Sequence, residues 1–233
     1  MFKNRSYAAE LLDNEHLPKE DLYQNLRELD FINRYLGGHD VVLKAIKKML
    51  IGISKTQQIH ILEIGSGGGD NLRAIATWGK KHGYDFKLTG VDLKQDCTDF
   101  AVQQSKSYSI KFITCDYQKA PFEQIGKPDI VFNSLFCHHF TDEQLHSMLN
   151  WMNENTSIGY TICDLHRHRL AYYSIKFLTA VFSKSYLVKN DAPLSVLRGF
   201  SKNEIVKILN EAKQGNFKIN WAWAFRWIIT VQH

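Results

Sequence analysis

The stretch ILEIGSGGGD at residues 61–70 constrains the fold of this chain more than any other. An apolar run ends on an acid, Glu63, and leads through a loop rich in glycine to a second acid, Asp70. A strand that passes through a glycine loop into a helix is typical of the first unit of a doubly wound α/β sheet. The stretch also indicates a ligand that contacts a carboxylate, a backbone without side chains and the first turn of a helix within one site.

The remaining sequence supports that architecture. Four more apolar, β-branched runs are FKLTGVD, IKFITCD, DIVFNSL and GYTICD, and amphipathic stretches occupy 70–82, 96–107 and 141–155. Apolar strands separated by helices indicate a parallel sheet covered on both faces. Capping boxes at 141–144 and 201–204 predict two helix starts. The tail FKINWAWAFRWIITVQH has two apolar-aromatic runs without a helix between them, which predicts an antiparallel hairpin at the sheet edge.

We therefore expect a doubly wound, Rossmann-like, mostly parallel sheet with a C-terminal antiparallel hairpin. No linker or repeat divides residues 1–233, so one domain is predicted, with a lid-like insertion at 165–200. Residues 1–55 are predicted to form a helical N-terminal cover. Pro18 can open one helix, Gly37 and Gly38 can end it, and Asp40 can cap the next.

Composition excludes several classes of protein. The 233 residues are 44% hydrophobic and 23% charged, as in a globular domain, and no stretch is apolar enough to span a bilayer. The N-terminus lacks the apolar region of a signal peptide. Four widely spaced cysteines without a Cys-x-x-Cys pair predict reduced thiols in the cytoplasm rather than disulfides or a zinc site. The net charge of +5 is spread along the chain, so it does not predict a nucleic-acid partner.

The ends of the predicted strands identify the ligand. A dinucleotide fingerprint would need glycine at position 70, where the chain has Asp70, and Glu63 would repel a pyrophosphate. Glu63 instead suits an ammonium group, and Asp92 can accept hydrogen bonds from two ribose hydroxyls. Asp116 can accept from an exocyclic amine, with Tyr117 or Phe136 flanking a base. That set of groups fits S-adenosylmethionine.

The motifs LEIGSGGG, GVDL, ITCDY and PDIVFNSLFCHHF resemble the four motifs of class I S-adenosylmethionine-dependent methyltransferases. The resemblance covers roughly residues 35–233. It implies methyl transfer, with S-adenosylhomocysteine as product. By matching position it implies a cofactor site made of Glu63, Gly65, Gly67, Asp92 and Asp116, joined by their motif neighbours Ser66, Leu93, Tyr117 and Asn133.

The segments RYLGGHDVVLKAI, CDLHRHRLAYY and SVLRGFSKNEI are similar to a bacterial small-molecule subgroup encoded beside type III polyketide synthases. This second resemblance implies a small acceptor, a phenolic or lipid-tailed polyketide, methylated at a hydroxyl.

Three histidines are candidates for the base that takes the hydroxyl proton: His139 or His138 first, and His166 behind them. Adjacent residues at a strand-to-helix turn point in different directions, so we expect at most one of the pair to face the substrate. The alternative is that one histidine braces the loop and the other is exposed. Around His166, the segment 164–169 forms either the mouth of the site or a solvated loop in which Asp164 pairs with Arg167. No metal site is predicted.

The apolar, aromatic segment 170–188 is interpreted as a lid, with a dimer contact, an interfacial helix or a plain buried helix as alternatives. We expect a small-molecule acceptor as the partner, without nucleic acid or stable membrane insertion, and a homodimer stays open. Alternative functions on the same fold are N-, C- or RNA methylation and cofactor binding without catalysis. A nicotinamide oxidoreductase is opposed by Asp70 and Glu63.

Overall fold

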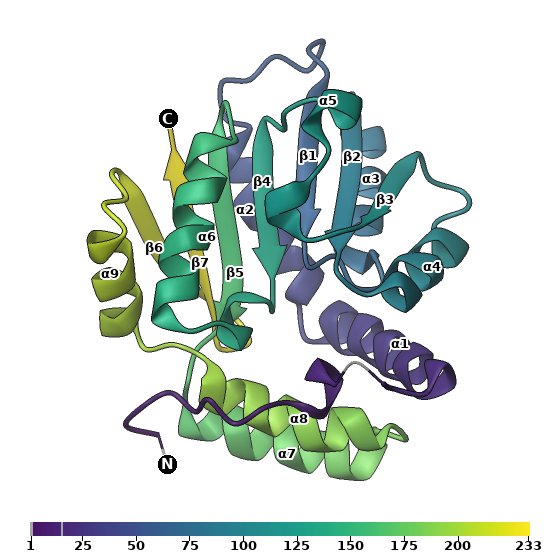
Figure 1. Ribbon diagram of the computed structural model, residues 1–233, viewed down its shortest axis with the longest axis vertical. Helices are drawn as coiled ribbons and strands as arrows, with labels where there is room; N and C mark the ends of the chain where they lie inside the picture. Colours follow the sequence, from purple (N-terminus) through teal and green to yellow (C-terminus); the bar gives the residue numbers. More distant parts are fainter. Residues whose placement is uncertain (1, 15) are drawn as a thin grey trace.

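The computed structural model describes residues 2–14 and 16–233. These residues form a seven-stranded sheet in the order β3-β2-β1-β4-β5-β7-β6 (Figure 1). Five strands run parallel: β1 (Ile59–Ile64), β2 (Phe86–Asp92), β3 (Ile110–Thr114), β4 (Ile130–Ser134) and β5 (Gly159–Leu165). β7 (Arg226–Gln232) is antiparallel to both β5 and β6 (Phe217–Ala222). The predicted doubly wound sheet with a terminal hairpin is confirmed.

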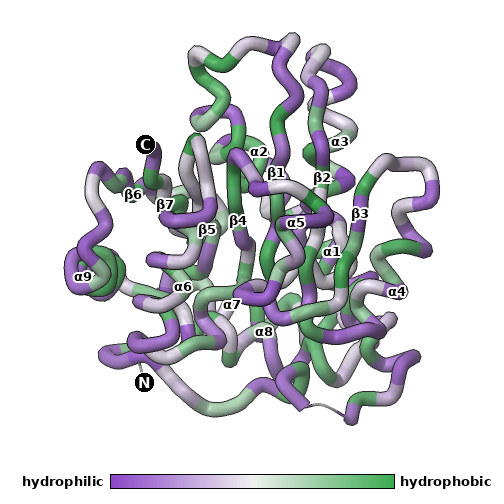
Figure 2. The backbone as a smooth tube through the Cα atoms, turned by 45° about the horizontal axis from the view of Figure 1, so that its top comes forward, coloured by the Kyte–Doolittle hydropathy of each residue, from purple (hydrophilic) through white to green (hydrophobic). Residues whose placement is uncertain are grey.

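Helices cover both faces of the sheet, because the central strands are apolar on both sides. α2 (Gly38–Met49) and α3 (Asp70–His82) pack on one face, and α6 (Asp142–Glu154) and α9 (Lys202–Glu211) pack on the other (Figure 1). α4 (Gln95–Gln104) contacts β2 and β3, and the short α5 (Phe122–Ile125) precedes β4. All six residues of β1 are buried. Figure 2 shows hydrophobic segments concentrated in the central strands.

Local sequence signals explain where the helices begin. Both predicted capping boxes are present, Thr141 with Gln144 at α6 and Ser201 with Glu204 at α9. α1 (Lys19–Tyr35) begins directly after Pro18. The prediction for Asp40 is wrong: Gly37, at a φ of 74°, is the N-cap of α2, and Asp40 lies inside the first turn. A positive φ favours glycine, so the glycine takes the cap position.

The N-terminal cover is only partly helical. Residues 2–10 contain no helix or strand, and they are followed by the short 3-10 turn η1 (Leu11–Asp13). The backbone N–H of Ser6 donates to the carbonyl of Leu197 at 3.0 Å. The first residues therefore run along the end of α8 rather than forming a helix of their own.

The insertion predicted at 165–200 consists of two helices, α7 (Arg169–Phe182) and α8 (Tyr186–Arg198), packed against each other. Together with α1 they lie beyond the carboxyl ends of the parallel strands (Figure 1). Two further 3-10 turns, η2 (Tyr117–Lys119) and η3 (Cys137–His139), follow β3 and β4 at the same edge. This edge is where ligands bind in doubly wound sheets.

Candidate active site

The loop between β1 and α3 consists mainly of glycines and lies at the carboxyl edge of the sheet. Gly65 and Gly67 both have positive φ, 68° and 48°. A side chain at position 65 would collide with the Phe136 ring, which lies against the loop. The backbone N–H of Ser66 donates to the carbonyl of Val91 at 3.0 Å and ties the loop to β2. A ligand can therefore approach the loop closely.

A cavity of about 680 Å³, the cofactor cavity, opens beside this loop. Eight of the nine residues predicted to bind the cofactor line it: Glu63, Gly65, Ser66, Gly67, Asp92, Leu93, Asp116 and Tyr117. The strand ends of β1, β2 and β3 thus contribute to one site, as the sheet topology requires.

Glu63 lies at the bottom of the site in an unusual electrostatic environment. Asn71 Nδ2 donates to its Oε1 at 2.9 Å, whereas Oε2 has no hydrogen-bond partner among the described residues. Burial, followed by the charges of Asp70 and Asp92, raises the pKa of Glu63 well above its ordinary value. A buried carboxyl group with an unused oxygen beside a cavity fits the ammonium group of a ligand.

Two more carboxylates are held in place for polar ligand groups. Asp92 accepts from the backbone N–H of Gly67 at 2.8 Å and from that of Lys94 at 3.0 Å, one bond to each oxygen. Asp116 accepts from the backbone N–H of Gln118 at 3.0 Å. Each carboxylate oxygen has more than one acceptor site, so both side chains can still accept from a ribose or an amine.

A second cavity of about 220 Å³, the acceptor cavity, adjoins the first. It lies between α1, α7, α8 and the turn that joins β6 to β7. The two cavities share Leu12, Leu29, Leu135 and His139 in their linings. Most of the remaining lining is apolar, for example Ile32, Leu36, Ile175 and Leu178.

His138 and His139 both line the acceptor cavity, so the expectation that at most one would face it is not met. Each imidazole is held through Nδ1 by a carboxylate. His138 Nδ1 lies 2.7 Å from Asp164 Oδ1, and His139 Nδ1 lies 2.9 Å from Asp13 Oδ1. In both rings Nε2 faces the carboxylate of Glu10, at 3.6 Å from His138 and 3.8 Å from His139. Both distances exceed that of a hydrogen bond, and the His139 side chain is partly exposed whereas that of His138 is buried.

Arg198, at the end of α8, is buried beside the histidine pair. Its Nε donates to the carbonyl of His138 at 3.0 Å, and its Nη1 lies 3.3 Å from Asp13 Oδ2. Burial raises the pKa of Glu10 to about 7, with the charges of His139 and Arg198 and the bond from Ser195 opposing it. The guanidinium thus balances the carboxylates that surround the two histidines.

Two predicted site residues lie elsewhere. The Asn133 side chain accepts from Cys137 Sγ and faces the sulfurs of Met148 and Met152, so it points into the interior under α6 and does not line the cofactor cavity. His166 lines neither cavity. Its Nδ1 accepts from Trp221 Nε1 at 3.3 Å, which holds the ring against the terminal hairpin. The structure thus corrects both placements.

The loop after β5 is also arranged differently from either interpretation. Asp164 is fully buried and bonds His138 rather than Arg167. Arg167 instead forms a bidentate pair with Glu204, at 2.7 and 2.8 Å. Burial alone would raise the pKa of Asp164, but the charge of His138 and the bonds that His138 and Leu165 donate lower it. Asp164 is therefore an ionised partner of His138.

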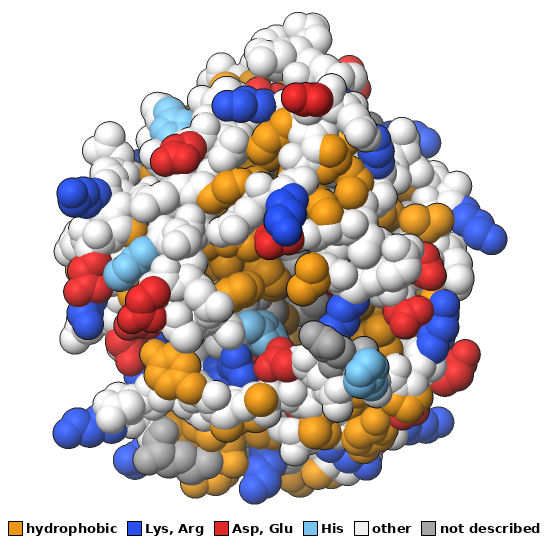
Figure 3. Space-filling model, in the orientation of Figure 1, with side chains coloured by type: hydrophobic (Ala, Val, Ile, Leu, Met, Phe, Trp, Pro, Cys, Tyr) orange, Lys and Arg blue, Asp and Glu red, His pale blue; other side chains and the backbone are white. Residues whose placement is uncertain are grey.

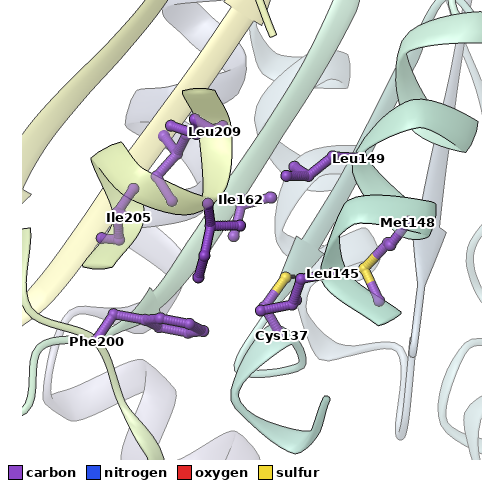
Figure 4. A pocket seen from close by; sticks show the side chains of 10 residues that line it. Cys137, Leu145, Met148, Leu149, Ile162, Phe200, Ile205 and Leu209 are labelled. Carbon is purple, nitrogen blue, oxygen red and sulfur yellow. Dashed lines mark hydrogen bonds between the residues drawn. The ribbon is translucent and has the colours of Figure 1, made fainter. Parts of the chain in front are cut away.

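Cys137, which follows β4, is a buried structural residue. Its thiol points into a small apolar space of about 30 Å³ between the sheet, α6 and α9 (Figure 4). Burial raises the pKa of this thiol, so it stays protonated and unreactive.

Among the residues that the structure describes, two groups of side chains have the types that bind metals: Glu10 with His138 and His139, and Asp30 with His39 and Asp70. In each group an arginine already supplies positive charge. Arg198 Nε lies 3.7 Å from Glu10 Oε1, and Arg73 Nη2 lies 3.1 Å from Asp30 Oδ2. We assign no metal to either group, and the expected absence of a metal remains a prediction.

The sequence did not identify four residues of the site: Glu10, Asp13, Asn71 and Asp164 in its role as partner of His138. Glu10 and Asp13 come from the segment before α1 and meet the histidine pair from far away in the chain, so no local pattern marks them. Asn71 could have been found, because the first turn of the helix after the glycine loop faces the end of β1.

Comparisons with known proteins agree with this fold. Residues 61–159 match a family model described as a methyltransferase domain. No curated protein matches the chain by sequence. Among solved structures, the plantazolicin methyltransferase BpumL in complex with SAH matches with a TM-score of 0.64 at 16% identity, over 92% of this chain and 95% of BpumL.

Two other solved structures share the fold. Human N-acetylserotonin methyltransferase in complex with SAM matches with a TM-score of 0.63 at 16% identity, over 92% of this chain and 56% of that one. Magnesium protoporphyrin IX methyltransferase from Synechocystis with bound SAH matches with a TM-score of 0.55 at 15% identity, over 84% and 83%. The methyltransferase-domain match over residues 61–159 and the shared fold agree with the class predicted from the sequence, a class I methyltransferase that depends on S-adenosylmethionine.

Within residues 2–14 and 16–233, no helix has the length and hydropathy needed to cross a membrane.

Proposed function

We propose that this methyltransferase modifies a hydroxyl group on a small phenolic or lipid-like acceptor bound in the acceptor cavity. The observation that carries the proposal is that His139 lines both cavities, with its Nδ1 held by Asp13. An imidazole whose Nε2 lies 3.8 Å from Glu10 Oε2 thus stands at the boundary between the cofactor site and an apolar cavity.

The residues of the cofactor cavity fit S-adenosylmethionine. Glu63 Oε2 would accept from its ammonium group, Asp92 from the ribose hydroxyls and Asp116 from the amine of the base. When bound, this cofactor supplies an electrophilic methyl group on a sulfonium. The chain itself has to hold the acceptor in line, keep water out and take up one proton.

The acceptor cavity favours an aromatic ring or an alkyl chain. Leu29, Ile32, Ile175 and Leu178 provide apolar contacts, and removing such a body from water contributes roughly 25 cal/mol per Å² of buried area. The Asp191 carboxylate and the Arg226 guanidinium also line it, so the cavity carries no net positive charge to attract a phosphate backbone. The cavity therefore supports a small acceptor over RNA.

His139 is the proposed general base. Its Nδ1–H donates to Asp13, so Nε2 is the atom that accepts the hydroxyl proton. Burial alone would raise the pKa of Asp13, but the hydrogen bond and charge of His139 lower it to about 2. An ionised Asp13 stabilises the imidazolium that forms, and Asp164 does the same for His138.

Replacing the base tests the proposal. In His139→Ala the turnover of a phenolic or long-chain hydroxyl acceptor should fall by about 10²- to 10⁴-fold, the usual contribution of general-base catalysis. The affinity for S-adenosylhomocysteine, measured by titration calorimetry, should stay within about twofold, well under the tenfold that 1.4 kcal/mol represents. His82→Ala, an exposed histidine on α3, is the matched control.

An unchanged turnover in His139→Ala would remove His139 as the base. Mass spectrometry of the product must also place the new methyl group on oxygen. A methyl group on nitrogen or carbon would overturn the hydroxyl assignment while leaving the cofactor site intact.

A further inference from the structure

Helix α7 has apolar residues on two opposite sides. Ala171, Ile175 and Leu178 face the acceptor cavity. The opposite side carries large apolar side chains that are 56–66% exposed: Leu170, Tyr173, Phe177 and Val181. Phe182, the last residue of the helix, is 74% exposed. Spacings of three and four residues place 170, 173, 177 and 181 in one stripe, which we call the outer stripe together with Phe182. A surface helix normally carries polar residues on its outer side, so packing within the chain does not explain this stripe.

The charge around the outer stripe is one-sided. Residues 165–190 contain five basic residues and no Asp or Glu. The formal charge of this segment is therefore +5, as large as the net charge of the whole chain. Arg167 is buried against Glu204. The other four are exposed: Arg169, Lys176, Lys184 and Lys189. Within the described part of the chain, none of these four forms an ion pair with an acidic side chain. Figure 3 shows hydrophobic and basic side chains together along the lower edge, where Figure 1 places α7 and α8.

The turn that ends the stripe is firmly held. Glu28 of α1 accepts from the backbone N–H groups of Lys184 and Ser185 at 3.0 and 3.1 Å. Phe182 and Lys184 are therefore presented on an ordered turn rather than on a loose loop.

We propose that the outer stripe docks on an anionic lipid surface. Exposed aromatic and aliphatic side chains on one side of a helix, with basic residues and no acids in the same segment, are the features of helices that lie in a membrane interface. Each Lys or Arg near such a surface contributes about 1 kcal/mol. With 14 residues, α7 lies in the interface and does not cross it.

A second copy of this chain fits the stripe less well than lipid does. A symmetric contact through α7 would bring the four exposed basic residues of each copy against the same four of the other. No acidic residue in 165–190 is present to offset that repulsion. An anionic lipid surface instead supplies the charge that this face lacks.

Docking would place the acceptor cavity directly behind the lipid surface, because the inner side of α7 lines that cavity. If the acceptor is lipid-like, which rests on the proposed function, it could pass from the membrane to the cavity without crossing water. Lipid binding itself does not depend on that assignment.

Vesicle co-sedimentation tests the proposal on the full chain. The protein should sediment with phosphatidylcholine vesicles that contain roughly a third phosphatidylglycerol, and much less with pure phosphatidylcholine, because the basic residues need anionic lipid. Raising the salt concentration should weaken the binding. Phe177→Ser combined with Phe182→Ser should lower the partition coefficient by about tenfold or more, since each substitution removes an exposed aromatic side chain that docking would bury in the lipid.

The control is Ile51→Ser, which removes an equally exposed apolar residue, 78% exposed, from the loop before β1 at the opposite edge of the sheet. This variant should bind the anionic vesicles like the parent. Both proteins should keep the thermal stabilisation by S-adenosylhomocysteine, so loss of lipid binding is separable from loss of the cofactor site.

Equal binding by the parent and the double Phe variant, or equal binding to both vesicle types, would overturn the proposal. So would a parent that binds no vesicles but forms a dimer by light scattering that the double variant loses. That last result would make the stripe a contact between copies.

Discussion

Glu63 carries a buried carboxyl group with one oxygen bonded to Asn71 and the other unused. Because burial raises its pKa well above the ordinary value, the group holds a proton when no cation is near. An arriving ammonium group stabilises the ionised form and lowers that pKa. Binding should therefore release a proton from Glu63.

The sign of the resulting pH dependence follows directly. Below the raised pKa the proton must be displaced, which weakens binding, and above it the carboxylate is already ionised. Affinity for S-adenosylhomocysteine should thus rise with pH until that pKa is passed. Titration calorimetry in two buffers of different ionisation enthalpy measures the released proton. Glu63→Gln should lose this release, whereas Glu123→Gln in the solvent-accessible α5 should keep it, and equal proton release in all three proteins would contradict the assignment.

For individual residues, the sequence predicted the lining of the cofactor cavity better than that of the acceptor cavity. Glu63, Asp92 and Asp116 each end a strand, and parallel strands bring their ends to one edge, so sequence position was enough. His139 was found by its chemistry, but its partner Asp13 is 126 residues away and carries no local signal. Asn133 was misplaced because position along a strand does not determine where a side chain finds its partners, here two methionine sulfurs and Cys137.

Among the elements, the segment before α1 shapes the acceptor side of the site. Buried Arg5 anchors it: Nη1 bonds Asp142 at 2.9 Å, Nη2 bonds the carbonyl of Phe140 at 2.9 Å, and Nε bonds that of Arg198 at 3.1 Å. This segment carries Glu10 and Asp13 to the histidine pair. Its anchor therefore contributes to both stability and catalysis.

Arg5→Ala should lower the free energy of unfolding by about 2 kcal/mol, because it leaves buried carbonyls without a donor. Turnover should also fall, since Asp13 would no longer be held against His139. Denaturant unfolding and acceptor turnover measure the two effects. Lys3→Ala, an exposed residue of the same segment, is the control. If Arg5→Ala matched Lys3→Ala in both measurements, the segment would not be anchored by Arg5.

Element boundaries followed from the sequence wherever a local hydrogen-bond pattern sets them. The capping boxes fixed the starts of α6 and α9, and Pro18 fixed that of α1. Asp40 failed as a cap because Gly37 can adopt the positive φ that the sharp turn between α1 and α2 requires. The pairing of α7 with α8 could not be predicted, because it depends on packing against α1 and on contacts with the N-terminal segment.

For the whole molecule, the alternation of strands and helices determined the sheet, and the sheet determined the cofactor cavity. The acceptor cavity is a product of tertiary packing between α1, α7, α8 and the terminal hairpin, elements distant in sequence. The cofactor site is therefore where the sequence and the structure agree most closely.

Thermal melting tests that central assignment most directly. S-adenosylhomocysteine at about 100 times its Kd should add roughly 2.7 kcal/mol of stability, which for a domain of this size corresponds to a rise of about 5–10 °C in Tm. NADH should add none, and Asp92→Ala should lose most of the rise with S-adenosylhomocysteine while keeping its fold. A rise with NADH alone, or an undiminished rise in Asp92→Ala, would contradict the cofactor site described above.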